Sequence, residues 1–309
     1  MSTIALNPPP EIKKKPISFS NILLGAFLNL CEVSTLGQPL EVTKTTMAAN
    51  REFTFMQAIK TVWSRGGVFG FYQGLIPWAW IEASTKGATL LFVSAEAEYL
   101  FKKNLGFGNF ASGISGGITG GVAQAYLTMG FCTCMKTVEI TRTKSAVSKS
   151  SWEIFKDIYR KEGIVGINKG VNAVAIRQMT NWGSRFGLAR LVEEGIRKFT
   201  HKDENERLNG YEKILASAVG GGLSAWNQPI EVIRVEMQSK KEDPNRPKKM
   251  NVVTAFKYIY KTNGLKGLYR GVTPRIGLGI WQTVFMVGFG DMAKEFIANL
   301  TGETPTGKH

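Results

Sequence analysis

The sequence has little of what most enzymes and metalloproteins use. Among its 309 residues are two histidines, His201 and His309, and three cysteines, Cys31, Cys132 and Cys134. The cysteines form neither a disulfide framework nor a zinc-ligand spacing, so we interpret them as small apolar residues. The phosphate-loop pattern GxxxxGK[ST] and the zinc-protease pattern HExxH are also absent. We therefore expect no enzyme activity, no metal site and no cofactor.

Long uninterrupted apolar runs are missing as well. Hydrophobic residues make up 43% of the chain, which is ordinary for a soluble protein. Six mostly apolar stretches nevertheless approach or exceed the roughly 20 residues that a membrane helix needs. They lie at about 20–47, 78–101, 111–144, 173–199, 211–239 and 275–298. In a bundle around a wet cavity each helix needs only one lipid-facing side, so we expect six transmembrane helices.

The N-terminus lacks the apolar core of a signal peptide. Its lysines at 13–15 lie between prolines, which does not fit the amphipathic, arginine-rich helix of a cleaved transit peptide. We expect residues 1–17 to be a disordered lead-in and residues 301–309 to be a tail. Any targeting information is then expected within the rest of the chain.

A short motif occurs three times and organises the chain. The copies read QPLEVTK at 38–44, TVEITR at 137–142 and QPIEVIR at 228–234. Their glutamates, Glu41, Glu139 and Glu231, lie 98 and 92 residues apart, and Thr137 replaces the proline in the second copy. Three copies at nearly one period predict three tandem units.

Each unit has the same order of elements. A short segment with apolar residues at helical spacing follows the motif, at residues 54–65, 151–162 and 252–263. A glycine-rich turn and a second long apolar stretch come next. In the second unit, Gly116 and Gly120 lie four residues apart on one helix face, which favours close helix packing. Each unit is therefore predicted as long helix, short surface helix, glycine turn and long helix.

The three units resemble the mitochondrial carrier family, whose signature is Pro-x-[Asp/Glu]-x-x-[Lys/Arg] on each odd helix with a glycine motif after the short helix. The resemblance covers about residues 18–300. It implies an all-α membrane protein of six transmembrane helices in three pseudo-symmetric repeats, with short matrix surface helices, around a central cavity. The repeats are expected at 18–105, 106–204 and 205–300, and the protein is expected to be a monomer.

The motif is expected to form a gate. A proline in a helix removes a backbone hydrogen bond and kinks it, so Pro39 and Pro229 are expected to bend helices that converge at one end. Thr137 predicts a smaller bend in the third long helix. Buried charges at this end need partners. The resemblance implies three ion pairs braced by Gln238: Glu41 with Arg142, Glu139 with Arg234, and Glu231 with Lys44.

Ionisable residues inside the even helices are the candidates for substrate contacts, because charges at such depth usually serve a pathway. Lys86, Arg177 and Arg275 supply three positive charges and Glu82 supplies one negative charge, which favours a dicarboxylate or tricarboxylate. Glu82 and Lys86 are also i,i+4 neighbours, so a pair that serves only helix packing is the alternative. Further candidates are Leu90, Gln178, Asn181 and Trp182, with Arg185 either a ligand or a surface charge.

The resemblance implies an antiporter that exchanges citrate and 2-oxoglutarate, or related di- and tricarboxylates, across the inner mitochondrial membrane by alternating access. A carrier of another small carboxylate is one alternative. The net charge of +15 predicts anionic partners, such as cardiolipin in the membrane. The lysine-rich loop 240–249 leaves binding of mitochondrial DNA as a second hypothesis, although no nucleic-acid recognition motif is visible.

Overall fold

The computed structural model is helical in every regular element that it describes. The described residues are 19–141, 150–181, 195, 198, 210–239, 246–247 and 249–285. The predicted lead-in, the predicted tail and most of the charged loop lie outside them.

The described helices follow the order predicted for each unit. The first unit contains α1 (Phe19–Glu32), η1 (Val33–Gly37), α2 (Gln38–Ala49), α3 (Phe55–Gly66), η2 (Gly67–Tyr72), η3 (Leu75–Ala79) and α4 (Trp80–Leu105). The second contains α5 (Asn109–Gln124), η4 (Ala125–Met129), α6 (Gly130–Thr141), α7 (Ser151–Ile167) and a helical segment at 171–181. The third contains α9 (Gly210–Leu223), η6 (Ser224–Asn227), α10 (Gln228–Gln238), α11 (Val252–Leu268) and α12 (Val272–Val284).

The first long helix of each unit is interrupted before the motif, directly before it in the first and third units and about two turns earlier in the second. In η1, Thr35 leaves the helical region at φ −95° and ψ −117°, and η6 is a turn of 3₁₀ helix. Pro39 and Pro229 stand in the first turn of α2 and α10, where the missing N–H of proline is not needed. In η4, before Thr137, a π-helical turn has helical dihedrals at both ends, as η1 does, so the smaller bend at Thr137 stays a prediction.

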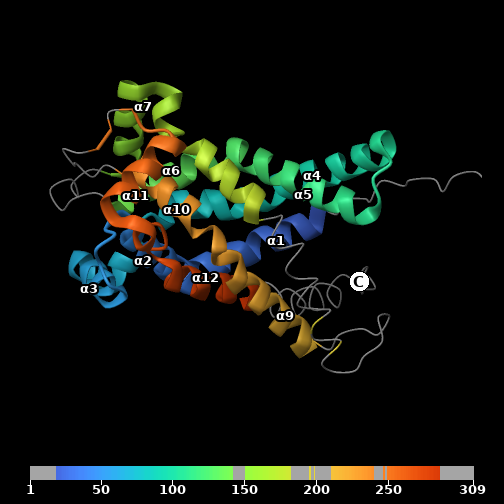
Figure 1. Cartoon of the computed structure of the whole chain (residues 1–309), viewed down its shortest axis with the longest axis horizontal. Coiled ribbons are helices and arrows are strands. Elements are labelled where there is room, and N and C mark those ends of the chain that lie inside the picture. The colour runs from blue at the N-terminus through green and yellow to red at the C-terminus, as the bar shows by residue number, and fades with distance from the viewer. Residues whose placement is uncertain are drawn as a thin grey trace, which may run out of the picture.

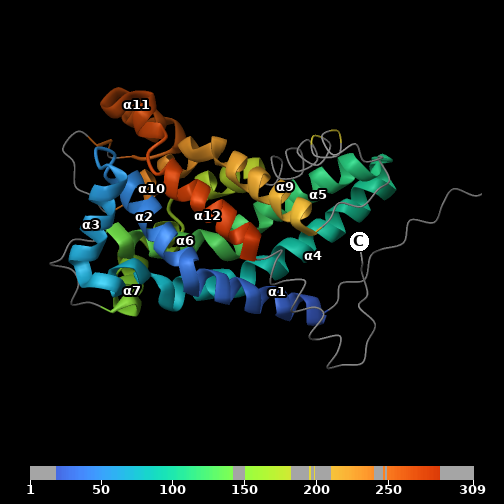
Figure 2. The same cartoon turned by 90° about the horizontal axis from the view of Figure 1, so that it is seen from below.

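The short helices α3, α7 and α11 begin in the same way. Thr54, Ser150 and Asn251 each close a capping box, in which the side chain of the cap accepts a backbone N–H three residues on. All three helices lie at one end of the molecule, and α4 and α5 extend together toward the other end (Figures 1 and 2). The capping sequences therefore fix where each unit turns at this end.

Three glycines join the units in a ring. Gly74, Gly170 and Gly271 have φ values of +72°, +78° and +79°, which favour glycine. A Cβ atom on each would lie 3.4 Å from the Cα of Lys136, 3.2 Å from the Cγ of Gln238 and 2.8 Å from the carbonyl oxygen of Lys44, respectively. The glycine turn of each unit therefore packs against the motif helix of the next unit, and the third unit packs against the first.

The α4–α5 pair shows the close packing that the glycine spacing predicts. A Cβ atom on Gly116 would lie 2.8 Å from the carbonyl oxygen of Ser94, and one on Gly120 would lie 3.0 Å from that of Leu90. The backbones of the two helices can approach this closely only because both residues are glycine. None of the described helices is by itself both long and apolar enough to qualify as a membrane span.

Candidate functional site

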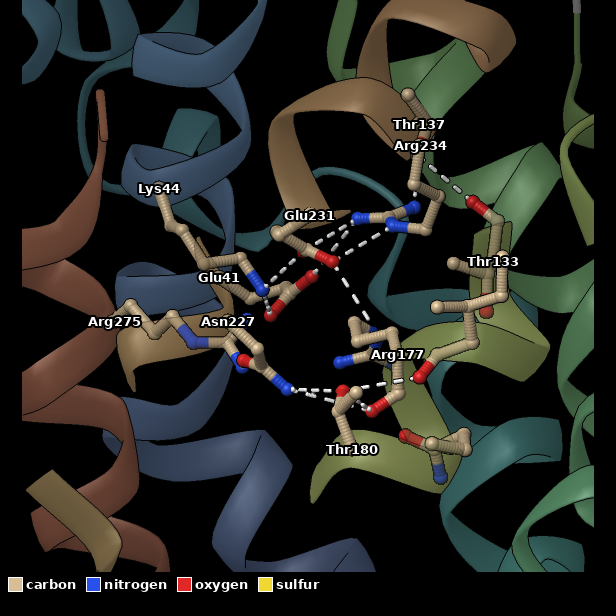
Figure 3. A network of polar contacts seen from close by, with 12 residues as sticks. Glu41, Lys44, Thr133, Thr137, Arg177, Thr180, Asn227, Glu231, Arg234 and Arg275 are labelled. Carbon is tan, nitrogen blue, oxygen red and sulfur yellow. Dashed lines mark hydrogen bonds and ion pairs between the residues drawn. The ribbon is translucent and has the colours of Figure 1, made fainter. Parts of the chain in front are cut away.

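Glu231 on α10 lies at the centre of a network of buried charges (Figure 3). One carboxylate oxygen, Oε1, is 2.8 Å from Lys44 Nζ and 2.7 Å from Arg234 Nη2. The other oxygen, Oε2, is 2.9 Å from Arg234 Nε and 3.4 Å from Arg177 Nε. The three cations come from the first, third and second units, so all three units meet at one carboxylate.

Lys44 on α2 connects this carboxylate to a second one. Its ammonium group lies 2.6 Å from Glu41 Oε2 as well as 2.8 Å from Glu231, so the predicted contact between Glu231 and Lys44 is present. Arg234 Nη2 is 4.0 Å from Glu41 Oε1. Two carboxylates and two cations from α2 and α10 therefore form one compact cluster, in which each charge faces an opposite charge.

The predicted pairing of Glu139 with Arg234 is not formed. Arg234 is instead held by both oxygens of Glu231, which lies one helical turn before it on α10. The carboxylate of Glu139 accepts a hydrogen bond of 2.7 Å from the Trp78 indole N–H. Arg142, the partner predicted for Glu41, lies outside the described residues. The pairing was wrong because a base three residues after an acid on one helix can reach it directly.

Gln238 occupies a bracing position, and Thr137 takes part in it. The amide oxygen of Gln238 accepts a 2.6 Å hydrogen bond from Arg234 Nη1, and its amide nitrogen donates to the carbonyl oxygen of Lys169 at 3.0 Å. The hydroxyl of Thr137 accepts from Arg234 Nη1 at 2.9 Å. The residue that replaces proline in the second motif therefore contributes a polar contact to the charge network.

Glu82 pairs with Lys136, a residue that was not predicted as part of the site. Its Oε2 atom is 2.8 Å from Lys136 Nζ on α6, and both side chains are almost buried. The pair with Lys86, which the spacing offered as an alternative, is not formed, although both residues lie on the same face of α4. A signal for Lys136 was present in the motif register, because the first and third units have Gln38 and Gln228 at the equivalent position.

Two of the predicted cations are tied together by an amide. Arg275 Nη2 donates to the Asn227 side-chain oxygen. The Asn227 amide nitrogen in turn donates to Thr180 Oγ1 at 2.8 Å and to the carbonyl oxygen of Arg177 at 3.4 Å. Asn227 and Thr180 were not predicted, and they connect the α12 cation to the segment that contains Arg177 (Figure 3).

Gln178 makes a chain of hydrogen bonds between the first two units. Its amide nitrogen donates to Gln124 at 2.6 Å, and Gln124 donates to the carbonyl oxygen of Lys86 at 2.7 Å. Leu90 packs over Gly120 of α5. Asn181 is partly buried at the end of its described segment. The remaining candidates, Trp182 and Arg185, lie outside the described residues.

Two further acids were not predicted as site residues. Glu32 at the end of α1 is 3% exposed, and Lys86 is the opposite charge that acts most strongly on it. Glu236, two residues after Arg234 on α10, pairs with Arg51 and lies 3.3 Å from Arg246. Glu32 falls in an otherwise apolar stretch, so its position alone was the available signal.

The helix order, the ring of three units and the buried charge network together define a class of protein. The chain belongs to the mitochondrial carrier family, described as mitochondrial carrier protein, which it matches over residues 15–104, 107–200 and 206–300.

Within this family the chain is similar to individual proteins. The chain is 79% identical over 303 residues to the citrate/oxoglutarate carrier protein of Saccharomyces cerevisiae, covering 96% of each chain. It is 26% identical over 274 residues to the mitochondrial 2-oxodicarboxylate carrier of Mus musculus, covering 82% of this chain and 87% of that one.

Proposed function

We propose that the protein is an antiporter that exchanges citrate and 2-oxoglutarate, or related di- and tricarboxylates, across the inner mitochondrial membrane by alternating access. Support comes from the family and from the 79% identity to a citrate/oxoglutarate carrier. The proposed architecture has six transmembrane helices in repeats at residues 18–105, 106–204 and 205–300 around a central cavity. In it the charge network closes the end where α3, α7 and α11 lie.

The network is proposed to act as the gate on that side. The residues predicted for this gate are Glu41, Lys44, Glu139, Arg142, Glu231, Arg234 and Gln238. Five of them contact one another in the network, whereas Glu139 bonds to Trp78 and Arg142 lies outside the described residues. Removing one partner from a buried pair leaves an uncompensated charge, which costs about 3–5 kcal/mol. The closed arrangement is therefore stable while every charge is paired, and an anion that competes for one of the cations destabilises it. A substrate that withdraws one cation would weaken the cluster around Glu231.

The observation that supports this mechanism is the position of Arg177. Its buried Nε atom lies 3.4 Å from Glu231 but makes no hydrogen bond within the described residues. A guanidinium group binds a carboxylate best through two parallel hydrogen bonds. A substrate carboxylate would provide that geometry, and Arg177 would then leave Glu231. Substrate binding and loosening of the gate would share one residue.

The charge balance of the proposed binding region suits a polyanion. It contains four bases, Lys86, Lys136, Arg177 and Arg275, and two acids, Glu32 and Glu82. The excess of two positive charges is the same as the excess predicted from Lys86, Arg177, Arg275 and Glu82 alone. Leu90, Gln178 and Asn181 are proposed to shape this region, and anionic lipid such as cardiolipin is proposed to surround a monomer. DNA binding by the loop 240–249 stays a prediction of the sequence alone.

Counter-exchange in liposomes tests the proposal. The purified protein is reconstituted into liposomes preloaded with citrate, 2-oxoglutarate, phosphate or ADP, and uptake of labelled citrate is measured. We expect uptake against internal citrate and 2-oxoglutarate, and only background uptake against phosphate or ADP. Good exchange of another solute, with no exchange of either acid, would overturn the substrate assignment.

Replacing Arg177 tests the proposed contact. Arg177→Ala is expected to lower citrate exchange by about 10- to 100-fold, because a charge-assisted hydrogen bond contributes roughly 1.5–3 kcal/mol. Arg160→Ala, which removes an exposed arginine of α7 in the same unit, is the matched control and should exchange at the wild-type rate. Equal rates for the two variants would move the substrate site away from Arg177.

A further inference from the structure

Lys136 stands where the other two units have a glutamine with a structural task. Gln38 donates a 2.5 Å hydrogen bond to the carbonyl oxygen of Gln73, and Gln228 donates one of 2.6 Å to that of Arg270. Each acceptor is the residue before a glycine of the inter-unit ring. In both units the glutamine therefore fastens the motif helix to the glycine turn.

In the second unit the equivalent hydrogen bond comes from a different residue. The carbonyl oxygen of Lys169, which precedes Gly170, accepts from Gln238 of the third unit at 3.0 Å. Lys136 is not needed for this task, and its ammonium group points to Glu82 at 2.8 Å. The glutamine-to-lysine difference is therefore linked to an ion pair between α6 and α4.

This ion pair decides the partner of Lys86. Glu82 precedes Lys86 by four residues on α4, the spacing and order at which a glutamate and a lysine ordinarily pair. Glu82 is instead held by Lys136 and, at 3.4 Å, by the hydroxyl of Thr133. Within the described part of the chain, no carboxylate lies within ion-pair distance of the Lys86 ammonium group. Lys86 therefore keeps a positive charge that its own helix would otherwise neutralise.

We propose that Lys136 is a positioning residue for substrate selectivity: by holding Glu82, it keeps the Lys86 ammonium group available for a carboxylate of the substrate. The inference rests on the proposed transport function and identifies which cation serves an additional carboxylate. Without Lys136, Glu82 would pair with Lys86, and the binding region would also have one positive charge fewer for an anionic substrate. Both effects disfavour a tricarboxylate more than a dicarboxylate.

The test compares KM values for citrate and 2-oxoglutarate in the reconstituted full-length protein. Lys136→Gln introduces the residue found in the other two units, and we expect it to raise the KM for citrate about tenfold and that for 2-oxoglutarate by less than about threefold. Lys136→Arg preserves the charge and should keep the citrate KM within about twofold of wild type. A tenfold change corresponds to about 1.4 kcal/mol.

A second substitution separates positioning from packing. In the double variant Lys136→Gln with Glu82→Gln, position 82 no longer carries a carboxylate that could capture Lys86, so the citrate KM should return at least halfway on a logarithmic scale. A purely structural ion pair would instead lower the maximal rate with unchanged KM values, and that result would overturn the inference. A double variant whose citrate KM is no lower than that of Lys136→Gln alone would also overturn the inference.

The outcome also distinguishes this inference from the proposed function. Absence of carboxylate exchange by the wild-type protein would reject the function itself. Normal wild-type exchange, with an unchanged citrate KM in Lys136→Gln, would reject only the role of Lys136. If a variant is too unstable to reconstitute, the citrate-induced rise in melting temperature of the purified protein replaces KM, and equal rises for Lys136→Gln and Lys136→Arg would overturn the inference.

Discussion

At the scale of single residues, Thr137 replaces the proline of the repeated motif and makes a contact that proline could not make. A proline at this position could not accept the hydrogen bond that Arg234 Nη1 donates to the Thr137 hydroxyl at 2.9 Å. The same hydroxyl lies 3.0 Å from the Gln238 amide oxygen. Thr137 thus adds an uncharged acceptor to the side of Arg234 that faces away from Glu231.

Removing this hydroxyl is expected to destabilise the protein. Thr137→Val keeps the shape of the side chain but leaves a buried guanidinium N–H with one acceptor fewer, which costs about 1–3 kcal/mol. Thr43→Val is the matched control, because the buried Thr43 hydroxyl bonds only to the carbonyl oxygen of Pro39 on its own helix. Thermal unfolding of the purified variants measures both effects, and an equal loss would contradict the role given to Thr137.

The sequence predicted the acids and bases of the charge network better than their partners. Glu41, Lys44, Glu231 and Arg234 follow from the repeated motif, and the structure brings all four together. The partner of a long side chain depends on the rotation of its helix and on competing neighbours. A single sequence contains little information on either, and so the Trp78 contact of Glu139 and the Lys136 contact of Glu82 were missed.

At the scale of elements, features that depend on local sequence could be predicted, and features that depend on helix packing could not. The glycines that allow α4 and α5 to pack, the capping residues of the short helices and the glycine turns could all be predicted, since each depends on local chemistry. The exact form of the helix breaks could not. The three interruptions before the motif are two π turns and one 3₁₀ turn, and they depend on how neighbouring helices pack.

A methyl group at the α4–α5 contact tests the packing. Gly116→Ala would place a Cβ atom 2.8 Å from the carbonyl oxygen of Ser94, so the helices must separate, at a cost of about 1–3 kcal/mol. Gly25→Ala is the control, because a Cβ atom there has no neighbour within 4 Å and alanine favours a helix. Thermal unfolding should show a lower melting temperature for Gly116→Ala only. A loss of the same size for Gly25→Ala would reject the close contact.

At the scale of the whole molecule, two sets of contacts hold the three units together. One is made of backbone, where each glycine turn packs against the motif helix of the next unit. The other is made of charge and centres on Glu231, which has cations from all three units within 3.4 Å. Packing around a glycine does not depend on the substrate, whereas ion pairs can be exchanged for contacts with an anion. The charge network is therefore the part suited to open and close.

The most direct test of a gate centred on Glu231 is the efflux of labelled citrate from preloaded liposomes with no substrate outside. Glu231→Gln removes the charge that three cations share, whereas Glu139→Gln keeps an acceptor for the single Trp78 contact at the equivalent motif position. We predict slow efflux through the wild-type protein and Glu139→Gln, and efflux at least about tenfold faster through Glu231→Gln. Equally slow efflux through all three proteins would contradict a gate centred on Glu231.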